Sequence, residues 1–253
     1  MTRLALLTLL VGCKVEPAPE DIDGLTRWFW TEYEPATDAE ISEAIEHLHT
    51  ALDNGDVTDA RTGELTDLSA EDLAGVTVPE GTDPTIARGF FMAYRYDCTL
   101  EALAPILTYQ DQNELFGVYD AYSRVYTSDA AAFDSGAAAT ISWEVTITTT
   151  LLNTTYTEIA RGGVRRTADA LVSRTWLTEP ATFEDSDWSF DQDYQIEAWY
   201  EPTPGEVVHL YGIWRWMALG SVDMDSDGML NTTLNNMQDW DDRTAEYCAS
   251  GLP

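Results

Sequence analysis

The stretch Ile141-Ser-Trp-Glu-Val-Thr-Ile-Thr148 alternates apolar and polar side chains without a break. Successive side chains of a β-strand point to opposite faces of its sheet, so this alternation predicts an antiparallel strand with one buried and one wet face. The turn residues Pro202-Thr-Pro-Gly205 predict a hairpin. Further strands are expected at 155–167, 170–178, 193–201 and 206–218. The region 118–220 is therefore predicted to be mainly a β-meander.

Helical signals come before this stretch. A capping box, Thr37 to Glu40, begins a helix whose apolar stripe runs as far as Leu52. In a capping box the two side chains satisfy free backbone N–H groups at the helix start. Further helices are expected at 25–33, 70–74 and 100–107.

The segment after Asp83-Pro84 fits two kinds of secondary structure. Its apolar positions from Phe90 to Tyr96 alternate as in a strand, whereas Ile86, Phe90 and Tyr94 have the spacing of one helix face. We favour the helix. The region 25–117 is then predicted to be helical throughout.

This order of elements predicts an α+β fold. Helices that precede a run of antiparallel strands typically pack on one face of the sheet, here a twisted C-terminal meander. An acidic tail, residues 221–253, completes a single domain that spans 25–253. No known family is identified for this body of the chain.

The composition excludes some partners. The chain has 45 acidic and 13 basic residues, which gives a formal net charge of −32 at pH 7. Such a chain repels nucleic acid over long range, so no nucleic-acid partner is expected. With 44% hydrophobic residues it can still bury a substantial core.

The N-terminus has the pattern of an export signal. A charged start is followed by an apolar run, Leu4 to Leu10, which is too short to span a bilayer. The residues Leu10-Val-Gly-Cys13 that end it resemble the lipobox of bacterial lipoproteins. That resemblance implies removal of 1–12, a lipid on Cys13 and a tether over 13–24. It implies a protein anchored to a membrane of the bacterial cell envelope, and Lys14 favours the outer membrane.

Two further cysteines, Cys98 and Cys248, remain in the exported chain. Exported proteins meet an oxidising compartment, so we predict a disulfide between them that closes a loop of roughly 150 residues. The alternative is a pair of buried free thiols.

An acidic segment near the C-terminus carries oxygen-bearing side chains at alternate positions. Calcium takes six to eight oxygen ligands, and a glycine, here Gly228, permits the sharp turn of a calcium loop. The pattern resembles the first half of an EF-hand or dockerin loop, although Leu234 stands where the usual bidentate carboxylate would be. The alternative is a solvated acidic turn. By the resemblance, the calcium ligands would be Asp223, Asp225, Asp227, Met229 and Asn231.

Basic residues on the predicted strands form a second candidate site. Arg161, Arg165, Arg174 and His209 could gather into a pocket for an anionic ligand. The alternative is that the arginines pair with surplus carboxylates and that the histidine is an ordinary residue of the sheet.

Three functions remain in order of preference, and no catalytic residue is assigned. The first is a non-catalytic, lipid-anchored envelope or surface protein with a binding or structural role and a structural calcium loop. It predicts no cleft with convergent titratable groups. The second is a module that binds a glycan or an anionic ligand. The third is an acidic secreted hydrolase, which predicts carboxylates, or His209 with a carboxylate, converging in a pocket. A protein or glycan partner is not specified.

Overall fold

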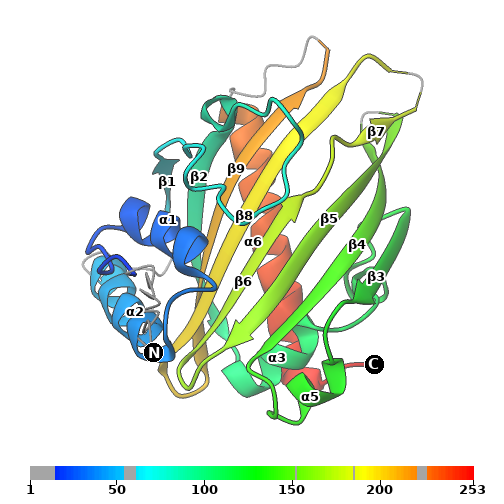
Figure 1. The fold of residues 1–253 in the computed structure, drawn as a ribbon. Helices are drawn as coiled ribbons and strands as arrows, with labels where there is room; N and C mark the ends of the chain where they lie inside the picture. Colours follow the sequence, from blue (N-terminus) through cyan, green and yellow to red (C-terminus); the bar gives the residue numbers. More distant parts are fainter. Residues whose placement is uncertain (1–14, 54–60, 152, 185, 221–226) are drawn as a thin grey trace, which may run out of the picture.

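The computed structural model describes residues 15–53, 61–151, 153–184, 186–220 and 227–253. Within these residues a nine-stranded antiparallel sheet has the order β1-β2-β9-β8-β6-β5-β4-β3, with β7 paired to β5. Helices cover this sheet, so the fold class is α+β as predicted (Figure 1). The strands are β1 (Arg61–Leu65), β2 (Arg88–Asp97), β3 (Ala121–Tyr126), β4 (Thr140–Leu151), β5 (Thr154–Arg166), β6 (Ala170–Leu177), β7 (Thr182–Phe183), β8 (Ser189–Thr203) and β9 (Glu206–Ala218).

The predicted meander is confirmed. Strands β4, β5, β6, β8 and β9 fall on the five predicted segments, and each pairs with the next of them in antiparallel register. The β8–β9 hairpin turns at Gly205, whose φ of 87° is in the left-handed region that glycine adopts without strain.

Three of the described helices have 11 residues or more, and the others have eight or fewer. Asp21 caps the first helix by accepting a hydrogen bond from the backbone N–H of Gly24, and Thr37 and Glu40 form the predicted capping box before the second. The helices are α1 (Ile22–Glu32), α2 (Asp38–Asp53), the 3₁₀ turn η1 (Pro84–Ile86), α3 (Leu100–Leu107), α4 (Gln112–Phe116), α5 (Ala130–Asp134) and α6 (Asp227–Ser250).

Helices cover both faces of the sheet, not one. In Figure 1, α1 and α2 lie over one face and α6 crosses the other. On the α1 face, Trp30 packs on Tyr194 and Trp214, and all three are almost fully buried. Gly212 of β9 permits α1 to approach closely, because a Cβ there would overlap the Thr26 side chain. The α6 face carries a second hydrophobic core that includes Trp143 and Trp199.

The predicted helix after Asp83-Pro84 is wrong. Residues 88–97 form β2, which pairs with β9 along its whole length and with the edge strand β1. The alternating residues Met92 and Tyr96 lie on the α6 face, while Phe91 and Ala93 join the core under α1. Only the first turn, η1, is helical. The region 25–117 is therefore not helical throughout, because it also supplies two strands of the sheet.

Two smaller expectations also need correction. Residues 70–75 form turns with i to i+3 hydrogen bonds, such as Asp72 N–H to Ser69 C=O, in place of the predicted helix 70–74. The spacing of Leu230, Leu234 and Met237 predicts a short helix in the acidic tail, but the tail contains the 24-residue helix α6.

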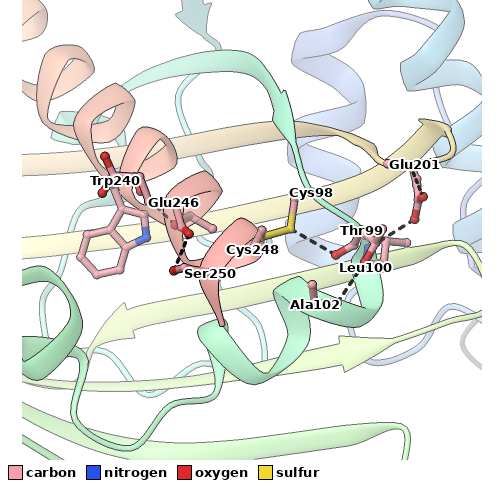
Figure 2. Close-up of a disulfide and its surroundings, with 11 residues drawn as sticks. Cys98, Thr99, Leu100, Ala102, Glu201, Trp240, Glu246, Cys248 and Ser250 are labelled. Atoms are coloured by element: carbon pink, nitrogen blue, oxygen red, sulfur yellow. Dashed lines mark hydrogen bonds between the residues drawn. A yellow bond between two sulfur atoms is a disulfide. The ribbon is translucent and has the colours of Figure 1, made fainter. Parts of the chain in front are cut away.

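The disulfide between Cys98 and Cys248 is confirmed. It ties the end of β2 to the last turns of α6, with a Cα–Cα distance of 5.4 Å (Figure 2). Beside it, Thr99 caps α3 by accepting a hydrogen bond from the Ala102 N–H, and Glu201 of β8 accepts one from the Leu100 N–H. The bridge thus joins α6, α3 and the sheet at one point.

The lipobox and Cys13 lie outside the described residues, as do residues 223–226 of the predicted calcium loop. Among the described helices, none is both long and apolar enough to cross a membrane.

Candidate functional site

A cavity of about 640 Å³ lies between α6 and the sheet face beneath it. Alternate side chains of β4, β5, β6, β8 and β9 line it, because successive residues of a strand point to opposite faces. Ligand pockets in proteins commonly have volumes of about 300–1,000 Å³. The cavity is therefore large enough for a small organic molecule.

One half of the cavity is apolar and aromatic. It is formed by the β4–β5 end of the sheet together with residues of α4 and α6. Arg124 of β3 lies over the Trp143 ring, 4.1 Å from its centroid, and donates hydrogen bonds to the carbonyl groups of Leu107 and Tyr109. The apolar half is lined by Phe116, Trp143, Val145, Ile147, Ala160, Val164, Met237 and Trp240.

The other half is polar. Asp193, Gln195 and Glu197 alternate along β8 and face the cavity, while the intervening Tyr194 and Ile196 belong to the core on the α1 face. Neighbouring strands add Ser173, Thr175, Tyr211 and Arg215. On the sheet, the cavity lining is thus mainly apolar over β4 and β5, the apolar half, and mainly polar over β8 and its neighbours, the polar half. The helices α4 and α6 add residues of both kinds, such as Met237 and Asp239.

Asp193 and Arg215 form a cross-strand ion pair in the polar half. Arg215 Nη2 lies 2.6 Å from Asp193 Oδ2, which also accepts a hydrogen bond from Gln195 Nε2 at 2.9 Å. Burial is the largest single influence and would lower the pKa of Arg215, but the charge and hydrogen bond of Asp193, together with the Tyr211 and Glu158 side chains, outweigh it and raise the pKa. Among the described residues, Asp193 Oδ1 and Arg215 Nε have no hydrogen-bond partner.

Glu158 of β5 adds a third charged group to this end of the cavity. Desolvation raises the pKa of Glu158 to about 7, assisted by the negative charge of Asp193 and opposed by Arg215. Close to neutral pH the Glu158 side chain is thus present in both protonation states.

At the other end of the polar half, Glu197 contacts a buried histidine. His209 Nε2 lies 3.2 Å from Glu197 Oε2, and His209 Nδ1 lies 2.9 Å from Asp241 Oδ1 of α6. Burial would lower the pKa of His209, but Asp241 and Glu197 outweigh it and raise the pKa to about 9. His209 also stacks on Trp199, with ring centroids 4.5 Å apart. The cation therefore joins α6 to the sheet from a fully buried position behind the cavity lining.

The basic residues proposed from the sequence do not gather into a pocket. Each of the arginines pairs with its own carboxylate, and none of them lines the cavity; His209 does not line it either. The ion pairs are Arg161–Glu144 at 2.6 Å, Arg165–Asp38 at 2.7 Å and Arg174–Glu34 at 2.8 Å. Arg165 and Arg174 contact α2 and the end of α1, on the opposite face of the sheet. The alternative prediction, that the arginines pair with surplus carboxylates, is therefore confirmed for these three residues.

The calcium site stays a prediction. Asp223 and Asp225 lie outside the described residues, Asp227 and Met229 fall in the first turn of α6, and Asn231 is exposed on that helix. In the described part of the chain, no three His, Cys, Asp or Glu residues are grouped so that they could hold a metal ion.

The sequence analysis does not identify the residues that line the polar half as candidate site residues. Asp193, Gln195 and Glu197 carry a signal, because they alternate with apolar residues on a predicted strand. Alternation of this kind indicates a wet face, and α6 covers that face with a cavity in between. Convergent carboxylates in a cavity also contradict the expectation, tied to the first functional hypothesis, that no cleft with titratable groups exists.

No protein-family model matches the chain, and no curated protein matches it. Several solved structures resemble it in part. A START superfamily protein from Mycobacterium smegmatis has 8% identity and a TM-score of 0.44, with 65% of this chain and 99% of that chain covered. Human StAR-related lipid transfer protein 5 has 6% identity and a TM-score of 0.46, with 84% of this chain and 97% of that chain covered. The ZhuI aromatase/cyclase from a Streptomyces species has 8% identity and a TM-score of 0.43, with 64% of this chain and 93% of that chain covered. Likeness at this level carries no conclusion about ligand or activity.

Proposed function

We propose that this protein binds a small amphipathic molecule in the cavity between α6 and the sheet. The observation that carries the proposal is the cavity itself, whose lining is divided into an apolar half and a polar half. Asp193 has a side chain that is 4% exposed, and its Oδ1 atom has no partner among the described residues. Leaving a buried polar atom unpaired costs roughly 1–3 kcal/mol, which a ligand group or a water molecule would recover.

A polarity-sensitive neutral dye, Nile red, tests this proposal. We expect its fluorescence to rise on mixing with the protein and to saturate at one dye per chain. The substitution Ala160→Phe places a ring in the apolar half and should weaken dye binding about tenfold or more. Its matched control is Ile159→Phe, because Ile159 is the adjacent residue of β5 and is exposed on the other face.

A second cavity variant guards against loss of folding. Thr149→Trp adds volume to the lining at a half-buried position, whereas Ala160 is buried. Circular dichroism would verify that each variant is folded. Equal dye binding by the wild type, both cavity variants and the control would contradict the proposal.

Catalysis is less well supported than binding. Asp193 is held by Arg215 and Gln195, and His209 lies outside the cavity lining, so neither is presented to a ligand as a free base. Glu158 is the group best suited to proton transfer, since its pKa is raised to about 7.

We further propose that the protein is lipid-anchored in a bacterial envelope through Cys13. The support is the lipobox-like sequence that ends at Cys13, and the disulfide agrees with an oxidising compartment. Mass spectrometry of the protein from membranes should find an N-terminal peptide that begins at an acylated Cys13. A native chain that retains Met1 and carries no fatty acid would refute the anchor.

A further inference from the structure

Glu158 and Asp193 lie at the same end of the cavity although β6 separates their strands over most of the sheet. β6 ends at Leu177, and beyond it Tyr156 of β5 contacts Phe190 of β8 directly, with ring centroids 6.1 Å apart. Glu158 and Asp193 are the next residues to face the cavity on these two strands. Both carboxyl groups act on the Arg215 guanidinium and raise its pKa.

This pair of carboxyl groups, which we term the acceptor site, carries two negative charges against the one positive charge of Arg215 when both carboxyl groups are ionised. Arg215 occupies Asp193 Oδ2 and lies over the Phe190 ring, 5.1 Å from its centroid. Asp193 Oδ1 is unpartnered in the described structure. The one guanidinium therefore balances one carboxylate. The second carboxyl group, Glu158, takes a hydrogen bond from Tyr156 but has no cation of its own at this end of the cavity, and Asp193 Oδ1 and Arg215 Nε have no partner among the described residues.

The remaining cavity-lining cations are directed elsewhere. Arg124 donates to two backbone carbonyl groups, and Arg243 donates to the carbonyl of Phe116. At the far end of the polar half, Glu197 is opposed by His209, which Asp241 already pairs. An anionic ligand group placed in the polar half would meet surplus negative charge, whereas a cation would be stabilised by it.

We propose that the ligand carries a cationic amine that binds between Glu158 and Asp193, with its apolar part against the β4–β5 half of the cavity. This inference rests on the proposed binding function and specifies its ligand class. A protonated amine can donate a hydrogen bond to Asp193 Oδ1 and neutralise the charge of Glu158, and an alcohol cannot supply that charge. Ala160, adjacent on the same face of β5, begins the apolar lining beside Glu158.

Displacement of bound Nile red by octylamine, octan-1-ol and octanoate at pH 8 tests this ligand class. The three compounds share one chain and differ in the head group, and pH 8 is above the Glu158 pKa of about 7. We expect octylamine to displace the dye at about a tenfold lower concentration than octan-1-ol, and octanoate to be weakest.

The substitution Glu158→Gln should weaken octylamine about tenfold and leave octan-1-ol unchanged. Glu144→Gln removes a carboxylate from the exposed ion pair with Arg161, outside the cavity, and should leave the order of the three compounds intact. Because Asp193→Asn unpairs the half-buried Arg215 and can disturb folding, Glu158→Gln is the deciding variant.

The outcomes separate this inference from the binding function. If the dye binds in the cavity but octylamine is no better than octan-1-ol, or octanoate is best, the amine is refuted and the cavity function stands. The amine is also refuted, and the cavity function stands, if no octyl compound displaces the dye or if Glu158→Gln leaves displacement by octylamine unchanged. If the dye does not bind in the cavity, the proposed function fails and the amine fails with it.

Discussion

At the residue scale, the buried pair of His209 and Asp241 couples stability to pH. The folded protein raises the pKa of His209 to about 9 from its ordinary value of 6.5, because Asp241 and Glu197 favour the imidazolium against the opposing effect of burial. A group with a raised folded pKa stabilises the fold fully below its unfolded pKa, and that contribution is lost as pH rises through the folded pKa.

We therefore expect the free energy of unfolding to fall by about 2 kcal/mol between pH 7.5 and 9.5. This range lies above the pKa of Glu158, so that group contributes little to the change. Urea denaturation at several pH values would measure how the free energy of unfolding depends on pH. His209→Gln should abolish the dependence, and His47→Gln on α2 should preserve it. A wild type whose stability is constant across this range would show that no such buried cation exists.

The acceptor site shows why some functional residues escape sequence analysis. Glu158 and Asp193 are 35 positions apart, and only the end of β6 and the Tyr156–Phe190 contact bring their strands together. Arg174, by contrast, follows the simple rule that a buried cation finds a carboxylate, here Glu34. Pairing rules are local, whereas convergence in a cavity depends on the whole sheet.

At the scale of elements, alternation in the sequence predicts a strand reliably where one face of that strand is buried and the other is polar. It located β4, β5, β6, β8 and β9. β2 was misread because its aromatic residues fit both periods, and its partner β9 lies more than 100 residues later. The 24-residue helix α6 gave a weak signal because polar residues such as Asp241 and Thr244 are buried on it.

The disulfide should hold α6 over the cavity. Cys248 lies in the last turns of α6, close to α3, and the bridge closes a loop of 150 residues (Figure 2). In chain-entropy models, opening a loop of that length lowers stability by about 5 kcal/mol through the unfolded state. Reduction should release the C-terminal end of α6 before the sheet opens, since β8 and β9 remain paired along their length.

Hydrogen exchange with and without a reductant would test this expectation. Amides of α6 and α3 should lose more protection on reduction than those of β8 and β9, which exchange only when the whole domain unfolds. A Cys98→Ser and Cys248→Ser double variant should behave like the reduced protein. Uniform acceleration across the sheet would mean that the bridge stabilises the whole domain and not α6 in particular.

The segment before α6 carries the calcium prediction, which rests on sequence alone. If Asp223, Asp225 and Asp227 bind the ion, calcium should raise the melting temperature and a chelator should reverse the rise. Asp225→Asn should remove the shift, whereas Asp120→Asn, elsewhere in the chain, should retain it. An identical melting curve in calcium and in chelator would reject the site.

At the scale of the whole molecule, charge repulsion opposes compactness. Arginines are placed against individual carboxylates, as in Arg95–Glu206 and Arg161–Glu144. With 45 acidic and only 13 basic residues, most carboxylates cannot have such a partner. Exposed ion pairs contribute roughly 0–1 kcal/mol each, so their loss by screening is small beside the relief of repulsion over the whole surface.

We therefore expect sodium chloride to raise the melting temperature at pH 7. At 0.1 M the screening length is about 10 Å, which is shorter than the distance across the domain, and the mutual repulsion of distant carboxylates is largely removed. Near pH 4.5, close to the isoelectric point of about 4.1, the net charge is small and the same salt should have little effect. Calorimetry at 10 and 500 mM salt at both pH values would measure the difference. An equal rise at both would assign the effect to the action of salt on water and apolar surface, and would mean that this acidic surface costs the fold little stability.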